Sequence, residues 1–214
     1  MLSPEQRNLL EETTNRYRLS LPGSQAEEYL AARGLLSAAD QFQLGAVVEP
    51  LPEHERYRGM LAIPYLRWDG HQKRSVVSIR FRCLEDHEHA GHGKYNTVSG
   101  DKPRLFNTVA IVTNDDTICI TEGEIDAIAC ALCGVPAVGV PGANSWQPHF
   151  AEPFLGFETV WVLADGDIPG RTFADTVSKS LPNARVMQMP DGMDVDSVRR
   201  VEGLDALKER GIAA

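Results

Sequence analysis

TICITEGEIDAIA (residues 117–129) and TVWVLADGDIPGR (residues 159–171) are the two stretches that decide the fold of this 214-residue chain. In each stretch, a short apolar run typical of a buried strand ends at acidic residues, and a helical pattern follows them. Strands are expected at 118–120 and 160–163, and helices at 125–133 and about 172–179. Strands that alternate with helices of this length predict βαβ units and a parallel sheet, and therefore an α/β fold.

Acidic residues follow each predicted strand. They are Glu122 after the first strand, Asp165 and Asp167 after the second, and Asp191, Asp194 and Asp196 after a third strand expected at 184–190. Ligands of parallel sheets collect beyond the carboxyl ends of the strands, so these groups should meet at one edge. Gathered carboxylates repel one another unless a cation lies between them, and hard oxygen ligands suit Mg²⁺ or Mn²⁺. A single Asp-x-Asp is common on loops, so the three clusters together predict the divalent-metal site.

At these residues the sequence resembles a known domain. Glu122-Gly123 with Asp126 four residues on, and then Asp165-Gly166-Asp167 ahead of Pro169-Gly170-Arg171, is similar to the Toprim signature. That domain is shared by DnaG-type primases, type IA and II topoisomerases, some nucleases and recombination mediators, and PDGMDVD (190–196) resembles its primase version. A haloacid-dehalogenase-like phosphatase also has an Asp-x-Asp at a strand end. That family places the pair on its first strand, whereas here the pair comes late.

The N-terminal part resembles the opening of a DnaG-type catalytic core. AEEYLAARGLLSAADQFQLGAV (26–47) is similar to that core's "YL…RGL" helix, short helix and "F.LG" segment. A capping box at Ser3 predicts a helix to about residue 18, and Ser24 opens a second helix that ends at Gly34. Alternating strands at 60–68 and 75–82 predict a hairpin around Asp69-Gly70.

Basic residues in and after this hairpin are the expected contacts for nucleic acid or nucleotide. Arg82 takes the strand-end position of the family's "P…G…R" segment, and HGKYN (92–96) resembles its KYLN motif. Leu is missing from the motif here, so the register between Lys94 and the next basic residue stays open. The resemblance implies the following contacts: Arg80, Arg82, Lys94, Tyr95, Lys102 and Arg104.

The formal net charge of −9 is divided unevenly along the chain. Residues 1–55 hold four basic and nine acidic side chains, residues 56–104 hold ten and five, and residues 105–214 hold seven and sixteen. An acidic part beside a basic segment suits a site where metals hold reacting phosphates while Lys and Arg hold a strand. A solvated β-ribbon would give the same basic segment, so charge alone does not show that this segment binds nucleic acid.

Other patterns bear on location and on further sites. The four cysteines form no disulfide framework, which fits a reducing cytoplasm in a bacterial cell or a phage-infected host. The N-terminus lacks an apolar core for a secretory signal, and prolines and glycines interrupt the longest weakly polar run, so no membrane span is expected. Four possible zinc ligands lie within ten residues, but their spacing matches no regular motif and favours an exposed loop: Cys83, His87, His89 and His92.

The resemblance implies a DNA primase catalytic core, a nucleotidyltransferase that makes short RNA primers on single-stranded DNA during replication. A 3′-hydroxyl would attack the α-phosphate of a ribonucleoside triphosphate, with Mg²⁺ or Mn²⁺ as cofactor. Glu122, Asp165 and Asp167 would be the catalytic carboxylates. The implied metal ligands are Glu122, Asp126, Asp165, Asp167, Asp194 and Asp196.

Three parts are expected along the chain. Residues 1–107 form an α+β subdomain of helices and a basic hairpin, residues 108–198 a Toprim domain with a mainly parallel sheet flanked by helices, and residues 199–214 a helical tail. Neither a zinc-ribbon module nor a helicase phosphate loop is present, which implies partners: a replicative helicase, a separate zinc-ribbon protein, or both. A Toprim nuclease and a non-catalytic DNA-binding or recombination mediator remain alternatives.

Overall fold

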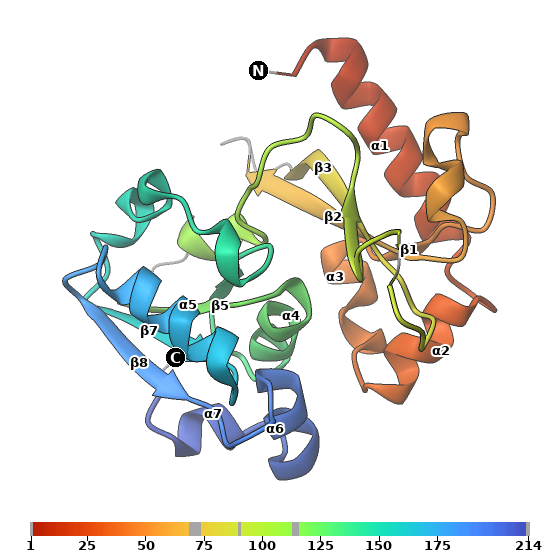
Figure 1. Ribbon diagram of the computed structural model, residues 1–214. Helices are drawn as coiled ribbons and strands as arrows, with labels where there is room; N and C mark the ends of the chain where they lie inside the picture. Colours follow the sequence, from red (N-terminus) through yellow and green to blue (C-terminus); the bar gives the residue numbers. More distant parts are fainter. Residues whose placement is uncertain (1, 69–73, 90, 113–115, 213–214) are drawn as a thin grey trace. The chain divides into compact units, whose positions relative to one another are not determined.

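The computed structural model describes residues 2–68, 74–89, 91–112 and 116–212. The chain divides into two compact units, residues 1–102 and 103–214 (Figure 1). The predicted boundary after residue 107 lies later than this division, because Leu105 packs in the core of the second unit and Phe106 pairs with Gly139. The predicted turn at Asp69-Gly70 lies outside the described residues.

Helices at the start of the first unit begin where their capping residues predict. The Ser3 hydroxyl accepts a hydrogen bond from Gln6 N–H (3.2 Å), and the Gln6 side chain accepts one from Ser3 N–H (2.9 Å). Ser24 caps the second helix by accepting a bond from Glu27 N–H (3.2 Å). The helical segments are α1 (Pro4–Leu19), α2 (Gln25–Ala32), η1 (Leu36–Ala38), α3 (Ala39–Phe42) and η2 (Pro52–Tyr57).

An antiparallel sheet forms the rest of the first unit. Its strands, in spatial order, are β1 (Gly45–Ala46), β2 (Leu61–Trp68), β3 (Arg74–Arg82) and β4 (Tyr95–Thr97). Phe81 of β3 stacks on Tyr57, with 4.1 Å between ring centroids, and contacts the edge of Tyr17 from α1. All three rings are buried. This aromatic packing fixes the strand that carries Arg82.

The second unit is built on a parallel sheet, which confirms the predicted α/β fold. Its strands, in spatial order, are β6 (Ala137–Gly139), β5 (Thr117–Thr121), β7 (Thr159–Ala164) and β8 (Ala184–Gln188). Ile118 and Ile120 of β5 and Val160 and Val162 of β7 belong to one buried core cluster, together with Phe173 of α5. Apolar strands covered on both faces are what a parallel sheet requires.

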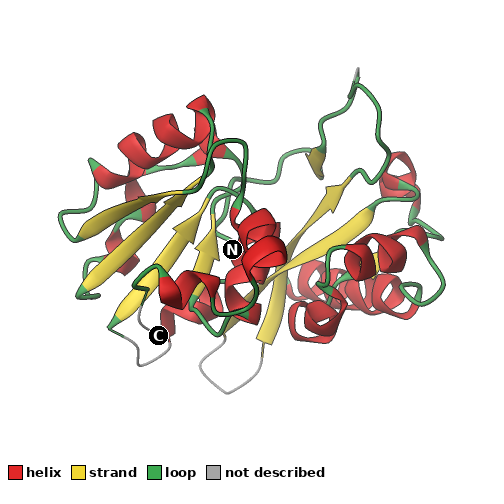
Figure 2. Ribbon diagram, turned by 90° about the horizontal axis from the view of Figure 1, so that it is seen from below, coloured by secondary structure: helices red, strands yellow, loops and turns green. Residues whose placement is uncertain are grey.

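Helices lie on both faces of this sheet (Figure 2). They are α4 (Glu124–Leu132), α5 (Ile168–Ser178), α6 (Val195–Glu202) and α7 (Ala206–Glu209), with short turns η3 (Thr108–Val112), η4 (Ala143–Ser145), η5 (Pro148–Phe150) and η6 (Glu152–Phe154). α5 begins earlier than predicted, because Asp167 caps it and Pro169 lies in its first turn. The predicted tail does not begin a separate part at residue 199, since α6 crosses that position and α7 buries Leu207.

The order of the strands creates a switch point between β5 and β7. From β5 the chain passes through α4 to β6 on one side, and from β7 it passes through α5 to β8 on the other. Because such crossovers are right-handed, the two helices fall on opposite faces and a crevice opens between the strand ends. The site is therefore expected beyond the carboxyl ends of β5 and β7. Across the described ranges, the structure contains no helix with the length and apolar character that crossing a membrane requires.

Candidate active site

Glu122 and Asp165 meet at the switch point. Thr121, the last residue of β5, pairs with Leu163 of β7, so the two strands end side by side. Glu122 follows the first strand end directly, and Asp165 follows Ala164 at the other. The edge predicted from the sequence therefore brings these two carboxylates to the same place, although more than forty residues separate them in the sequence.

Asp165 is the centre of the acidic group. Its side chain is largely buried, and its Oδ1 has no hydrogen-bond partner among the described residues. Burial, followed by the negative charges of Asp126, Glu122, Asp194 and Asp167, raises the pKa of Asp165 to about 8. Four of the other five predicted metal ligands thus lie near enough to act on Asp165 electrostatically.

Glu122 has the same combination of burial and missing partners. Its Oε2 is buried without a hydrogen-bond partner in the described part of the chain. Burial raises the pKa of Glu122, and the charge of Asp167 raises it further. Buried polar atoms in folded proteins normally have a partner. Two orphaned carboxylate oxygens at one strand edge, made only of hard oxygen donors, fit a bound divalent cation such as Mg²⁺.

Asp167 and Asp194 are held in place by the helices that they cap. Asp167 Oδ1 accepts a hydrogen bond from Gly170 N–H (2.7 Å) at the start of α5, and Asp194 Oδ1 accepts one from Ser197 N–H (2.7 Å) at the start of α6. Capping leaves each side chain few rotamers. The two helix starts therefore position one carboxylate each beside Asp165.

Asp126 and Asp196 connect the helices α4 and α6. Asp126 on α4 is buried, and its Oδ1 accepts a hydrogen bond from the Asp196 N–H (3.1 Å). The fully buried Asp196 side chain pairs with Arg199 (2.6 Å) and Arg200 (3.3 Å) on its own helix. The predicted part of Asp196 in metal binding stays a prediction, and this carboxylate already has cationic partners.

Two glycines of the predicted signature, Gly166 and Gly170, allow close backbone contacts around the end of β7. Gly166 N–H donates to Met193 O (2.8 Å) and Gly166 O accepts from Gly192 N–H (2.8 Å), which joins the loop after β7 to the loop after β8. A Cβ at Gly166 would meet Pro190 O at 1.8 Å, and a Cβ at Gly170 would meet Asp165 O at 2.3 Å. In the sequence, the glycine between Asp165 and Asp167 was the feature that could have indicated this close approach of the backbone to Pro190.

Arginine and tyrosine side chains cluster in the first unit. Arg82 of β3 lies opposite Tyr95 of β4, and its guanidinium carbon is 4.8 Å from the Tyr95 ring centroid. The Arg80 guanidinium lies 5.1 Å from the same ring, on the same face of the strand. The Arg82 guanidinium also lies 5.2 Å from the ring centroid of Tyr29 on α2, a contact that the sequence did not predict. Stacked guanidinium and aromatic groups are suited to phosphates and bases. We call Tyr29, Arg80, Arg82 and Tyr95 the arginine–tyrosine cluster.

The other predicted basic residues lie at more exposed positions. Lys94 and Lys102 are exposed, and Lys94 directly precedes β4. Arg104 is partly buried and belongs to the second unit. Five of the six predicted contacts for nucleic acid or nucleotide are therefore in the first unit.

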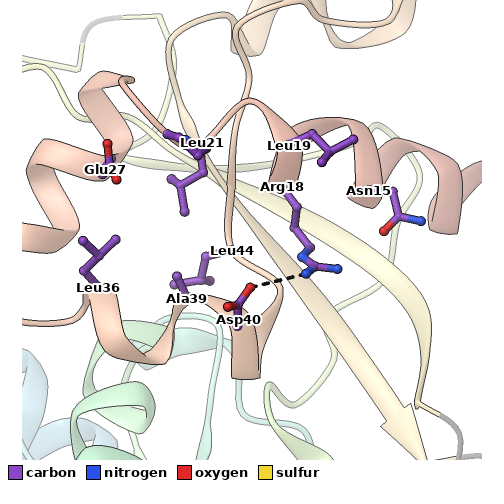
Figure 3. A pocket seen from close by; sticks show the side chains of 10 residues that line it. Asn15, Arg18, Leu19, Leu21, Glu27, Leu36, Ala39, Asp40 and Leu44 are labelled. Carbon is purple, nitrogen blue, oxygen red and sulfur yellow. Dashed lines mark hydrogen bonds and ion pairs between the residues drawn. The ribbon is translucent and has the colours of Figure 1, made fainter.

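A separate pocket of about 480 Å³ lies in the first unit (Figure 3). Four leucines and four polar or charged side chains are among the ten residues that line it, and Arg18 and Asp40 in this lining form an ion pair (3.3 Å). None of the residues predicted to act on substrate or metal lines this pocket. The charged residues of its lining are Arg18, Glu27 and Asp40, and none of them belongs to the predicted metal or phosphate contacts.

A parallel sheet with carboxylates at its switch point is the arrangement of a Toprim domain, and residues 119–199 match the protein family described as Toprim-like. The Gene 57 protein of Mycobacterium phage D29 is 56% identical over 154 residues, which cover 72% of this chain and 99% of the phage protein. A DNA primase of Pseudomonas aeruginosa is 35% identical over 103 residues, or 44% of this chain, and the matched part spans only 16% of that primase.

Solved structures show the same fold over nearly the whole chain. A DNA primase domain from Pseudomonas aeruginosa matches with a TM-score of 0.76 and 25% identity, covering 95% of this chain and 77% of that one. A DnaG primase catalytic domain bound to ssDNA matches with a TM-score of 0.73 and 22% identity, covering 95% and 79%. The chain therefore belongs to the same family as the phage D29 Gene 57 protein and has the fold of a DnaG-type primase catalytic core with a Toprim domain.

Proposed function

We propose that this protein is a DNA primase catalytic core that synthesises short RNA primers on single-stranded DNA with Mg²⁺ or Mn²⁺. The observation that carries the proposal is the pair of buried, unpartnered oxygens on Glu122 and Asp165 at the switch point of a primase fold. A buried carboxylate pair of this kind is costly to keep without a cation. Perturbed carboxyl pKa values in a crevice are typical of functional sites.

Each group in the site has a proposed task. Glu122, Asp165 and Asp167 would hold the metal, with Asp126 and Asp194 beside them and Asp196 in support. The bound metal would lower the pKa of the attacking 3′-hydroxyl and neutralise charge on the α-phosphate and the leaving pyrophosphate. Because the strand ends and the two helix caps fix these carboxylates, the protein itself supplies the alignment of the reacting groups.

The arginine–tyrosine cluster would bind the polynucleotide or the triphosphate. Guanidinium forks bind phosphate oxygens in pairs, and a tyrosine ring offers a face on which a base can stack. Lys94 and Lys102 would add a charge contact that depends on salt concentration. Arg104 in the second unit would contact a phosphate of template or substrate.

The partners are part of the proposal. A related DnaG structure is described as bound to ssDNA, and the primase fragment of the bacteriophage T7 primase-helicase protein shares the fold (TM-score 0.60, 22% identity, covering 86% of this chain). We therefore propose ssDNA and ribonucleoside triphosphates as ligands. A replicative helicase, a zinc-ribbon protein or both would be partners in the cytoplasm of a bacterial or phage-infected cell.

The test is primer synthesis on unprimed single-stranded DNA with labelled ribonucleoside triphosphates and Mg²⁺ or Mn²⁺. Short RNAs should form with the wild type and vanish with Asp165→Asn/Asp167→Asn. Asp175→Asn is the matched control, because it removes an exposed carboxylate from the same helix, α5, away from the strand edge. A parallel lane with DNA alone detects cutting. Metal-dependent cutting without primers would favour a Toprim nuclease, and primers that persist in the double variant would overturn the proposal.

A silent wild type would be assayed again with a replicative helicase and a zinc-ribbon protein added. Primers in that mixture that depend on Asp165 and Asp167 would support the proposal. Tight DNA binding with no primers and no cutting in the full mixture would instead favour a non-catalytic mediator.

A further inference from the structure

Four side chains with metal-binding atoms converge at the connection between β3 and β4. Cys83 follows β3 directly, and His87, His89 and His92 lie on the same connection. One ligand atom from each residue, the thiol sulfur or a ring nitrogen, lies within 4.8 Å of the other three. We propose that these residues form a structural Zn²⁺ site, separate from the carboxylate site of the second unit.

The distances are close to those of a tetrahedral site. Cys83 Sγ lies 3.9 Å from His87 Nε2, and the His89 ring centroid lies 4.8 Å from that of His87 and 5.3 Å from that of His92. Zinc bonds of about 2.0 Å to nitrogen and 2.3 Å to sulfur place ligand atoms roughly 3.3–3.7 Å apart. Ligand atoms that lie 4.8 Å apart would have to approach by roughly 1.1–1.5 Å, which side-chain rotation allows.

The partners of the histidines also fit a metal. The Glu85 carboxylate lies 2.9 Å from His87 Nδ1, so a proton on that nitrogen would leave Nε2 free to bind on the side of Cys83. A carboxylate behind a histidine is a common outer partner of zinc ligands. His89 Nδ1 and His92 Nδ1 are buried and have no hydrogen-bond partner among the described residues. A cation among the four would satisfy both nitrogens.

The ligand types select the metal and its role. One thiolate and three imidazoles favour zinc over Mg²⁺, which prefers oxygen ligands. Four protein ligands leave no open position, so the ion would stabilise the fold instead of activating water. Cys83 N–H donates to Lys94 O (2.9 Å), so an ion bound to Cys83 would hold the connection directly beside Lys94 and Tyr95. The spacing of the four residues matches no regular zinc motif, so the sequence alone favoured an exposed loop.

The first measurement is the zinc content of an untagged protein that is grown with added zinc and purified without chelators. We expect about one zinc per chain by elemental analysis. Replacement by Co²⁺ should give the strong visible absorption of a tetrahedral ion and a thiolate-to-cobalt charge-transfer band. Amide exchange at Lys94 and Tyr95 should become faster when zinc is removed.

Variants separate this site from the carboxylates. His92→Asn and Cys83→Ser should lower the zinc content at least tenfold, whereas His149→Asn, at an exposed histidine of the second unit, should keep it. Asp165→Asn/Asp167→Asn should also keep it. If Cys83→Ser does not fold, the charge-transfer band of the Co²⁺-substituted wild type shows whether a thiolate binds the metal. The proposal would be overturned if the wild type bound no zinc and its Co²⁺ form showed no thiolate-to-cobalt band. It would also be overturned if zinc were lost in Asp165→Asn/Asp167→Asn and kept in His92→Asn.

Discussion

Asp165, a proposed metal ligand, is held in a position that lowers the stability of the metal-free fold. Its carboxyl is crowded by four others and largely buried, so the negative form is disfavoured in the metal-free protein. The folded-state pKa of about 8 lies above the value of 3.8 for an unperturbed Asp. Between these two pH values the folded protein keeps a proton that the unfolded chain has lost. The free energy of unfolding therefore falls as pH rises through this window.

Asp165→Asn removes this effect, because the amide carries no charge at any pH. At pH 8.5 we expect the metal-free variant to be more stable than the wild type by on the order of 1–2 kcal/mol. The free energy of unfolding of the variant should also fall much less as pH rises. Urea denaturation from pH 5 to pH 8.5 checks this, with Asp175→Asn as control. Mg²⁺ should raise the thermal midpoint of the wild type and not that of Asp165→Asn. A variant that is less stable at every pH would contradict the explanation.

Asp196 tests a structural role against a metal-binding one. Its removal would leave the buried Arg199 without its closest carboxylate, at 2.6 Å. We expect Asp196→Asn to lower the free energy of unfolding by about 3–5 kcal/mol. Glu202 lies at the end of the same helix, α6, and pairs with Arg210 after α7, so Glu202→Gln breaks a more exposed ion pair and should lower the free energy of unfolding much less. Unchanged stability with lost Mg²⁺-dependent activity would place Asp196 in the metal site instead.

The contact between β7 and α5 sets the position of the Asp-Gly-Asp triplet. Gly170 faces the backbone of Asp165 so closely that a methyl group there would lie 2.3 Å from Asp165 O. We expect Gly170→Ala to push the helix from the strand end, lowering the thermal midpoint and weakening Mg²⁺ binding, measured by calorimetry. Gly156→Ala is the control, since its added methyl group would meet open space. Equal behaviour of the two variants would contradict this account of the strand end.

The pairing of β3 with β4 builds the arginine–tyrosine cluster. The Arg82 guanidinium contacts the rings of both Tyr29 and Tyr95, so a lysine would lose the contacts of the planar group while keeping the charge. We expect Arg82→Lys to weaken binding of a fluorescent single-stranded DNA roughly tenfold, an effect of about 1.4 kcal/mol. Arg67→Lys, at an exposed position of β2, should bind like the wild type. A folded Arg82→Lys protein with unchanged affinity would remove the cluster from the proposed DNA contacts.

The two units differ in charge as they do in fold. Residues 1–102 hold 13 basic and 14 acidic side chains, and residues 103–214 hold 8 and 16, which gives net charges of −1 and −8. Each unit has its own buried core. A strongly acidic unit repels a polynucleotide unless metal ions are bound, so most of the DNA affinity should come from the first unit.

The two units can be produced separately to test which of them binds DNA. We expect residues 103–214 to fold and to bind Mg²⁺ without measurable affinity for single-stranded DNA. Residues 1–102 should bind DNA with an affinity that falls steeply as salt increases. Circular dichroism establishes folding, and fluorescence anisotropy measures binding. DNA binding by the second unit alone, without metal, would contradict this division of tasks.

The sequence by itself determined most of the elements and the edge of the sheet at which Glu122 and Asp165 meet. Strand and helix types follow from local periodicity, helix starts follow from capping residues such as Ser3 and Ser24, and parallel strands must end at one edge. These properties depend on neighbours along the chain, so the predicted parallel sheet was confirmed and Glu122 and Asp165 came together as expected.

Only the tertiary structure decided which long-range partners each side chain has. The stacking of Tyr29 on Arg82, the approach of Gly166 to Pro190 and the convergence of Cys83 with three histidines depend on how separate segments pack. The pairing of Asp196 with two arginines likewise depends on the burial of α6. Local pattern does not encode such distances, because they result from the packing of the whole core.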